Sequence, residues 1–430
     1  MEYVSNGDGT CYVSGIGTCT DIEIVIPTIS PDGDTVIGIG DWAFQECFEV
    51  TSIVLPDSLK RIGERAFGCC YSLKSITVPD SITDISDYAF ETCSGLISVT
   101  IPDSVISIGE GAFAGCELLA SITLSSNITS ISKYAFAACT SLTSISIPGN
   151  VAIIDDWAFE GCSALTSIAI PDSVISIGKY AFSYCAGLTS LTIPEGVISI
   201  GSAAFIGCEG LADKNGFVIV RETVYDYFGS DTSVIIPDGV IGISDQAFEG
   251  CSNLTAIIIP DSVRSIGEGV FIDCSALTSI TIPDGVPSIN DGIFWNCSGL
   301  ISIIIPDSVI NIGNEAFRGC SSLTSITIPD GVTSIGDRAF RDCSNLTSIK
   351  LPSGLTSIGI GAFDSCTSLT HITFPDGVTC IDQSFVHCTS LTSITFEGTK
   401  SQWLAISKWG NWNFKVPATV VHCKDGDIAI

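Results

Sequence analysis

Residues 162–182 of the chain read CSALTSIAIPDSVISIGKYAF, and most of the sequence repeats this pattern. Leu165, Ile168 and Ile170 are apolar at the spacing L-x-x-I-x-I. The alternation at its end predicts a short strand with one buried face. Pro171 ends the strand because proline has no backbone N–H to donate, and the Asp-Ser pair that follows is typical of a turn. The first half of the pattern therefore predicts a strand that leads into a turn.

The second half of the pattern predicts another extended stretch and then a short helix. Val174 and Ile177 are expected to point inward, and Ala181, Phe182 and Cys185 suit one face of a helical turn. The residue that would cap this helix is Gly, Ser, Asp or Asn in every repeat, the set favoured at a helix N-cap. The next residue is often acidic, which would complement the helix dipole. The predicted capping positions are Gly40, Gly63, Ser86, Gly109, Ser132, Asp155, Gly178, Gly201, Ser244, Gly267, Asn290, Gly313, Gly336, Gly359 and Asp382.

A cysteine that recurs every 23 residues indicates the architecture. A fixed period of this length is typical of a solenoid, in which each repeat packs on its neighbours. We therefore predict an α/β solenoid of 23-residue units, with a parallel β-sheet on the concave face, short helices on the other side and a cap at each end. The periodic cysteines are Cys47, Cys70, Cys93, Cys116, Cys139, Cys162, Cys185 and Cys208, then Cys251, Cys274, Cys297, Cys320, Cys343 and Cys366, with a slip of one residue to Cys388.

The pattern C-x-x-L-x-x-I-x-I-P-D-S-V-x-x-I-G-x-x-A-F closely resembles the BspA-like, or Treponema-type, leucine-rich repeat family. Residues 320–340, CSSLTSITIPDGVTSIGDRAF, match it as well as residues 162–182 do, and fifteen Phe-x-x-Cys units carry the resemblance along nearly the whole chain. GDGTCYVSGIGTCTDIEIVIP and FEGTKSQWLAISKWGNWN are similar to the family's terminal caps. The resemblance implies a bacterial or protist surface protein, in several cases an adhesin for host or partner-cell proteins, and it implies no catalytic residues.

The places where the period breaks predict five segments. Two apolar runs around Arg221 and Glu222 interrupt the array and resemble a hairpin. Trp403, Trp409 and Trp412 near the end would cover the last open strand edge. The predicted segments are an N-terminal cap at 1–40, a first leucine-rich repeat array at 41–208, an irregular hairpin-like insertion at 209–232, a second array at 233–397 and a C-terminal cap at 398–430.

The composition argues against several classes of function. The chain carries 17 Lys and Arg against 47 Asp and Glu, a net charge of −30, and has no basic cluster. Nucleic acid and anionic membrane surfaces are therefore not expected partners. No stretch approaches the roughly 18 apolar residues of a membrane span. Three histidines, all late in the chain, and no catalytic motif lead us to expect neither enzymatic activity nor a cofactor.

The cysteines have functional and structural interpretations. Stacked strands about 5 Å apart bring the periodic cysteines near one another, but parallel side chains seldom point correctly for a disulfide. Buried, unpaired thiols are therefore favoured, whereas Cys11 and Cys19 remain disulfide candidates if the protein is secreted. A Cys/His cluster late in the chain matches no zinc spacing, so no metal site is predicted there. That cluster consists of Cys366, His371, Cys380, His387 and Cys388.

A column of aspartates follows the strand prolines in the second array. Such a row of carboxylates could attract Ca²⁺, whose ligands are oxygens. Asp also suits a Pro-Asp-Gly or Pro-Asp-Ser turn, and the solvated turn is the favoured interpretation. The column consists of Asp238, Asp261, Asp284, Asp307 and Asp330.

One position of each repeat, between the two strand aliphatics, should line the open face of the sheet. Most of these residues are Thr, a good strand former, but three are Ile in the second array. An apolar and aromatic patch on a polar face predicts a partner site. The alternative is that the insertion packs over these isoleucines and buries them. The predicted partner-binding residues are Ile235, Ile258, Ile304, Tyr225, Tyr227 and Phe228.

Together these features predict a non-catalytic, monomeric protein-binding scaffold. We expect a cell-surface or secreted adhesin that recognises a host matrix, serum or partner-cell protein through its concave face. Two alternatives remain open: an intracellular or structural interaction protein, and a calcium-dependent glycan binder. Residues 1–5 lack the character of a signal peptide, so the expected location is either the cytoplasm or, for a mature secreted form, the cell exterior.

Overall fold

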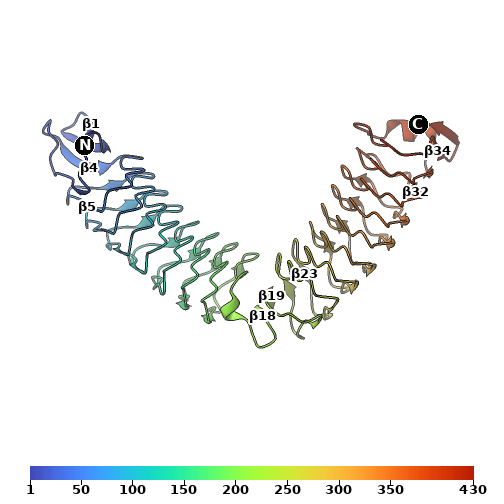
Figure 1. Ribbon diagram of the computed structural model, residues 1–430, viewed down its shortest axis with the longest axis horizontal. Coiled ribbons are helices and arrows are strands. Elements are labelled where there is room, and N and C mark those ends of the chain that lie inside the picture. Colours follow the sequence, from blue (N-terminus) through green and yellow to red (C-terminus); the bar gives the residue numbers. More distant parts are fainter. The chain divides into compact units, whose positions relative to one another are not determined.

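The computed structural model describes all 430 residues, which form a β-solenoid of stacked coils with very little helix (Figure 1). By their contacts, the residues divide into two compact units, Met1–Lys214 (unit 1) and Asn215–Ile430 (unit 2). A typical coil contributes one strand from the L-x-x-I-x-I half of its repeat and a second, two-residue strand from the half after the proline turn. We call the sheets that these strands build the first-strand and second-strand sheets.

In unit 1, strands of successive coils pair in parallel, as Ser167 pairs with Ser190, whereas the first two strands of the chain are antiparallel. The second-strand sheets contain β1 (Glu2–Ser5), β2 (Thr10–Gly15), β4 (Thr35–Ile39), β6 (Arg61–Ile62), β8 (Asp84–Ile85), β10 (Ser107–Ile108), then β12 (Ser130–Ile131), β13 (Ile153–Ile154), β15 (Ser176–Ile177) and β17 (Ser199–Ile200). The first-strand sheets contain β3 (Glu23–Val25), β5 (Ser52–Val54), β7 (Ser75–Ile76), β9 (Ser98–Thr100), β11 (Ser121–Thr123), then β14 (Ser167–Ala169) and β16 (Ser190–Thr192). A 3-10 turn, η1 (Glu209–Leu211), follows.

Unit 2 repeats this plan after an antiparallel pair of strands, β18 and β19. Its second-strand sheets contain β18 (Phe217–Val220), β19 (Thr223–Tyr227), β21 (Gly242–Ile243), β23 (Ser265–Ile266), then β25 (Ser288–Ile289), β27 (Asn311–Ile312), β29 (Ser334–Ile335) and β31 (Ser357–Ile358). Its first-strand sheets contain β20 (Ser233–Ile235), β22 (Ala256–Ile258), β24 (Ser279–Thr281), β26 (Ser302–Ile304), then β28 (Ser325–Thr327), β30 (Ser348–Lys350), and finally β32 (His371–Phe374), β33 (Ser393–Phe396), β34 (Val420–Cys423) and β35 (Gly426–Ala429). The one α-helix, α1 (Lys400–Ala405), lies between β33 and β34.

Each coil sends the same side chains into the core, so identical residues meet along the stack. The phenylalanines form the clearest column: the rings of Phe90 and Phe113 lie 5.2 Å apart at 8°, and Phe159 and Phe182 lie 5.3 Å apart at 7°. Such a pair adds about 0.5–1.5 kcal/mol beyond the burial of its area. Because each ring stacks on two neighbours, the repeat favours Phe in every coil.

Turns take the place of the predicted short helices. The N–H of Phe159 donates to the carbonyl of Ala181 in the next coil at 2.8 Å, and the N–H of Cys162 donates back to Phe159 at 3.1 Å. Trp157 before them has a φ of 54°, which belongs to the left-handed region. A helix would need each N–H to reach the carbonyl four residues back. Here alternate N–H groups bond the neighbouring coil, so the expectation of helices opposite the sheet is corrected to a column of turns.

The polar residues before these turns contact the adjacent coils and do not cap helices. Asp156 Oδ1 accepts the N–H of Lys179, which lies 23 residues later, at 2.7 Å. A Cβ on Gly178 would lie 2.4 Å from the N atom of Asp156, so glycine lets these two coils approach closely. Where Asn replaces that glycine, the Asn290 amide donates to Ile266 O at 2.6 Å. The set Gly, Ser, Asp and Asn thus reflects contact between coils.

The ladder thiols are buried in both units and unpaired, as the favoured interpretation predicts. Apart from the first ladder cysteine of each unit, each thiol donates to the carbonyl of a phenylalanine in a preceding coil, as Cys162 Sγ does to Phe136 O at 3.2 Å. Cys47 and Cys251 are partly exposed because each begins the ladder of its unit. The Cys11 thiol points to Asp34 O and the Cys19 thiol to Asp21, so these two are not bonded to each other here.

The first prediction concerns the acceptor between coils. Asp156→Ala removes the acceptor for the Lys179 N–H and should lower the free energy of unfolding by about 1 kcal/mol. Asp156→Asn keeps an acceptor oxygen, as Asn314 does naturally for the N–H of Asp337, and should unfold like the wild type. Urea unfolding followed by circular dichroism measures both. Equal destabilisation by the two variants would contradict this role and favour a purely electrostatic one.

The second prediction concerns thiol reactivity. Burial raises the pKa of Cys116 to about 12, so at pH 8 only about one thiol in ten thousand is a thiolate. Iodoacetamide should therefore spare Cys116 in the native protein and label the partly exposed Cys19 and Cys423. An unfolded thiol ionises near pH 9, so the stabilisation from a protonated Cys116 is complete below pH 9 and is lost as the pH rises toward 12. Mass spectrometry of native and denatured samples is the measurement, and native labelling of Cys116 would contradict the buried ladder.

Candidate functional site

Three isoleucines line the outward face of a first-strand sheet in unit 2. The strands lie in the order β20, β22, β24, β26, with Ile235 opposite Ile258 and Thr281 opposite Ile304. The isoleucine side chains are between 57% and 66% exposed. Adjacent strands lie about 4.8 Å apart, so the side chains form a row across the sheet. We call Ile235, Ile258, Thr281 and Ile304 the isoleucine row.

Strand alternation keeps the row exposed. Val234 and Ile257, the preceding residues of β20 and β22, are buried in the core. Successive side chains of a strand point to opposite faces, so burying these residues leaves Ile235 and Ile258 facing solvent. The prediction from the sequence pattern therefore places the three isoleucines correctly on the surface.

The insertion does not cover the row. Its strand β19 pairs with β21, so the hairpin joins a second-strand sheet, and the isoleucines of the first-strand sheet remain exposed. This pairing also corrects part of the predicted site, because Tyr225 and Tyr227 are buried. The ring of Tyr227 packs on Phe248 at 5.3 Å, and burial raises the pKa of Tyr225 to about 12. These two side chains belong to the core, and of the three predicted aromatics Phe228 alone stays exposed.

An acidic edge runs beside the isoleucine row. Three residues after each row position stands an exposed aspartate: Asp238, Asp261, Asp284 and Asp307. The structure contains no group of three or more His, Cys, Asp or Glu that could hold a metal ion. At the other end of these strands, Thr255 and Thr278 donate their hydroxyls to carbonyls of the preceding coil at 2.7 and 3.2 Å. The row is thus an apolar strip with negative charge along one side.

Comparison with known protein families identifies the family to which these repeats belong. The family described as "BspA type Leucine rich repeat region (6 copies)" matches residues 25–118, 85–212, 218–321 and 288–403. The chain belongs to the BspA-type leucine-rich repeat family. No curated protein matches the chain.

Solved structures similar to this BspA-type chain include three bacterial proteins. A leucine-rich repeat protein from Bacteroides ovatus is 27% identical, covering 98% of this chain and 97% of that one, with a TM-score of 0.44. A leucine rich cell surface protein from Faecalibacterium prausnitzii is 29% identical, covering 95% and 96%, with a TM-score of 0.48. The pneumococcal vaccine antigen PcpA is 19% identical, covering 94% and 93%, with a TM-score of 0.41. The present BspA-type structure has no helix with the length and apolar character needed to cross a bilayer.

The Cys/His cluster of the sequence does not gather in this BspA-type fold. The thiols of Cys366 and Cys388 are buried and donate to the carbonyls of phenylalanines in the preceding coils. Cys380 Sγ instead lies 3.2 Å from an Asp382 oxygen, and His387 Nδ1 lies 3.2 Å from Asp364 Oδ1. The fifth member, His371, stands exposed on β32.

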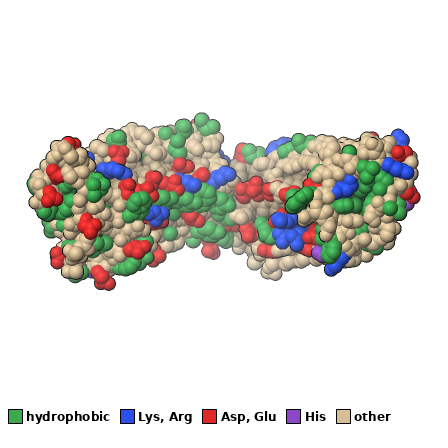
Figure 2. Space-filling model, turned by 90° about the horizontal axis from the view of Figure 1, so that it is seen from above, with side chains coloured by type: hydrophobic (Ala, Val, Ile, Leu, Met, Phe, Trp, Pro, Cys, Tyr) green, Lys and Arg blue, Asp and Glu red, His purple; other side chains and the backbone are tan.

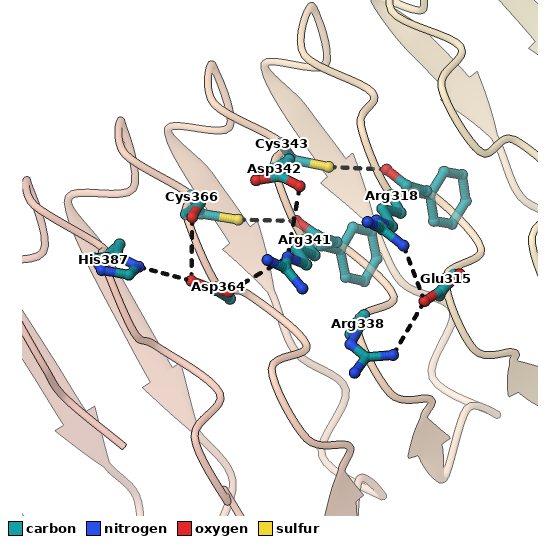
Figure 3. A network of polar contacts seen from close by, with 12 residues as sticks. Glu315, Arg318, Arg338, Arg341, Asp342, Cys343, Asp364, Cys366 and His387 are labelled. Atoms are coloured by element: carbon teal, nitrogen blue, oxygen red, sulfur yellow. Dashed lines mark hydrogen bonds and ion pairs between the residues drawn. The ribbon is translucent and has the colours of Figure 1, made fainter. Parts of the chain in front are cut away.

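Near His387 lies a network of ion pairs on the turns of unit 2 (Figure 3). Glu315 accepts from Arg318 at 3.2 Å and from Arg338, 23 residues later, at 3.3 Å. The Arg341 guanidinium lies 3.4 Å from Asp364 in the following coil. Asp342 lies 3.6 Å from the same Arg341 guanidinium, so three carboxylates face three guanidinium groups and the network joins successive coils.

Two surface features were not predicted from the sequence. In unit 1, Tyr134, Trp157 and Tyr180 stack at 5.1 and 5.4 Å from the position before Ala-Phe. Ile198, at the position before Ser-Ile on β17, is 85% exposed. Both features are visible in the sequence when the residues at each position of the repeat are compared from coil to coil. Figure 2 shows hydrophobic side chains gathered in patches on the viewed face of each unit, with acidic side chains around them.

The third prediction tests whether the isoleucine row is open to solvent. Ile258→Asp should leave the melting temperature nearly unchanged, because the side chain is exposed. Its neighbour Ile257 is the matched control, and Ile257→Asp buries a charge in the core and should cost several kcal/mol. Differential scanning calorimetry compares the two variants with the wild type. A large loss from Ile258→Asp would mean that this side chain is covered.

Proposed function

We propose that this protein is a non-catalytic scaffold that binds another protein through the isoleucine row. The observation that carries the proposal is the register of Ile235 and Ile258 on paired strands, with Ile304 two strands further along the same sheet. Exposed apolar side chains that lie together are the usual core of a protein interface. Threonine at the same position of other coils shows that the repeat does not require isoleucine there.

The acidic edge defines the chemistry of the partner. Asp238, Asp261 and the later aspartates place negative charge next to the apolar row, and the whole chain carries −30. A complementary partner presents an apolar strip flanked by lysine or arginine. Charged rims mainly set the association rate and its dependence on salt, whereas the desolvated apolar centre supplies most of the affinity.

Membership in the BspA-type family supports a role in protein binding. On this basis we propose that the protein acts as an adhesin outside the cell and as a monomer, and that its partner is a host matrix, serum or partner-cell protein. The charged network around Glu315 and Arg341 supports a non-catalytic role, because its groups are paired with one another between coils. The proposed contact is therefore a surface of the sheet and involves no chemical step.

The fourth prediction is that Ile258→Asp abolishes capture of the partner. Wild type, Ile258→Asp and Thr100→Asp would be immobilised and exposed to purified matrix and serum proteins. Thr100 occupies the same outward position on β9 of unit 1, so its variant adds the same charge on an equivalent strand. A protein that binds wild type and Thr100→Asp but not Ile258→Asp is the expected result.

Salt dependence provides the second readout of this experiment. Association of the captured partner should slow as the salt concentration rises from 50 to 500 mM, because salt screens the acidic edge, while dissociation should change little. Equal binding of the partner to wild type and Ile258→Asp would overturn the isoleucine row as the contact. Capture of nothing by the wild type would favour a structural or intracellular role.

A further inference from the structure

A cleft of about 580 Å³ opens near the beginning of unit 1, beside strands β2, β4 and β6. Its wall includes two aromatic rings, Tyr12 from β2 and Trp42 from the first turn of the array. Its polar side chains include Asn6, Asp41, Lys60 and Arg61. The volume lies in the range of small-molecule sites, and the mixture of flat apolar surface with a few polar groups is typical of them.

Two glycines make room for this cleft. Gly38 on β4 pairs with Arg61 on β6, which in turn pairs with Asp84 on β8, so the first coil lacks a side chain where the next two coils carry a charged one. A Cβ on Gly40 would lie 2.9 Å from a ring carbon of Tyr12 and 3.0 Å from Val13 O. Glycine at position 40 therefore lets the Tyr12 ring lie against the backbone.

The tryptophan of the cleft presents free ring surface. Trp42 is 53% exposed, and its backbone is held by an N–H bond to Glu64 O at 2.8 Å. Trp157 occupies the equivalent position five coils further along, and there the ring is stacked on Tyr134 and Tyr180. The Trp42 ring has no such stack, so one of its faces is available to a ligand.

The polar groups of the cleft are ordered and carry an excess of positive charge. Asp41 Oδ1 accepts from Arg61 at 3.0 Å and from the Glu64 N–H at 2.9 Å, which fixes the carboxylate. Lys60 is exposed and forms no ion pair. Since Asp41 and Arg61 neutralise each other, the ammonium of Lys60 leaves one positive charge unbalanced in a chain whose net charge is −30.

From this arrangement we propose that the cleft binds an acidic sugar, a pyranose that carries a carboxylate or a sulfate. The apolar C–H face of a pyranose stacks on an aromatic ring such as Trp42, while Asn6, Asp41 and Arg61 donate to or accept from its hydroxyls. The acidic group pairs with Lys60 by a charge-assisted bond. A nucleotide, with its several phosphate charges, would need more cations than this cleft supplies.

The full chain is titrated with four probes, and binding is followed by tryptophan fluorescence and by isothermal titration calorimetry. The probes are glucuronic acid, N-acetylneuraminic acid, a glucuronate-containing sulfated disaccharide, and glucose as the neutral reference. We expect saturable binding of at least one acidic probe, at least tenfold tighter than that of glucose. Tighter binding of the disaccharide than of both monosaccharides would identify a polymeric glycan as the source of the sugar.

Variants separate the cleft from other surfaces. A Cβ on Gly38 would meet no atom closer than 3.6 Å, so Gly38→Gln adds a side chain beside Tyr12 and should abolish binding, as should Trp42→Ala. Lys60→Ala should weaken the binding of the acidic probe at least tenfold and leave the binding of glucose unchanged. Lys74 is also exposed, so Lys74→Ala is the matched control and should not change the affinity of either probe. Melting curves confirm that each variant is folded.

Three results would each overturn the proposal. None of the acidic probes binds saturably, glucose binds as tightly as the acidic probes, or the Gly38→Gln variant binds an acidic probe as tightly as the wild type does. Ile258→Asp, which belongs to unit 2, should bind the acidic probe like the wild type. Failure of the cleft and failure of the isoleucine row can therefore be told apart.

Discussion

Hydrogen bonds between the turns of successive coils are the interaction on which the structure depends. Phe136 donates to Ala158 at 2.9 Å and Phe159 donates to Ala181 at 2.8 Å, and the same bond recurs along the stack. A buried N–H without a partner costs about 1–3 kcal/mol, so a coil cannot satisfy its backbone alone. The strict period follows, because a coil of another length would misplace these donors. The shorter coil before Cys388 keeps this bond, because the N–H of Phe363 still donates to Ser384 O at 2.8 Å.

The same constraint makes the ends of the chain different from its repeats. Elements that do not follow the repeat lie beside the first and last coils of the structure. At the beginning, β1 and β2 form an antiparallel pair and β2 pairs with β4. At the end, Trp403 of α1 packs on Phe374 and Phe396 at 5.8 and 5.4 Å. The cleft beside Trp42 lies where the first regular coil meets such an end element.

The strands and the core could be predicted from the sequence because their signals are local. Alternation around Ile168 and the recurrence of Phe182 directly indicate which side chains are buried. The helices could not be distinguished from turns in this way. The spacing of Ala181, Phe182 and Cys185 fits either structure, and the choice depends on a hydrogen-bond partner more than twenty residues away.

The candidate site shows the same limit. Ile258 was correctly placed on the surface because its exposure follows from strand alternation, which is local. Tyr225 and Tyr227 were misplaced because their burial depends on β19 pairing with β21, and no residue pattern identifies that partner. The cleft could not be predicted for a related reason, since the significance of Gly38 depends on its pairing with Arg61 of the next coil.

In a repeat protein, recognition must come from positions that the stacking leaves unused. The outward position of the first strands varies among Thr, Ile, Val, Ser, Ala and Lys, and Gly38 or Arg61 can occupy one column of the second strands. Substitutions at exposed positions of this kind usually change stability by less than about 0.5 kcal/mol. The buried Phe and Cys columns have no such freedom, because each side chain contacts the coil before it and the coil after it. Stability and recognition therefore reside in different columns of the same repeat, and binding surfaces can change while the stack is preserved.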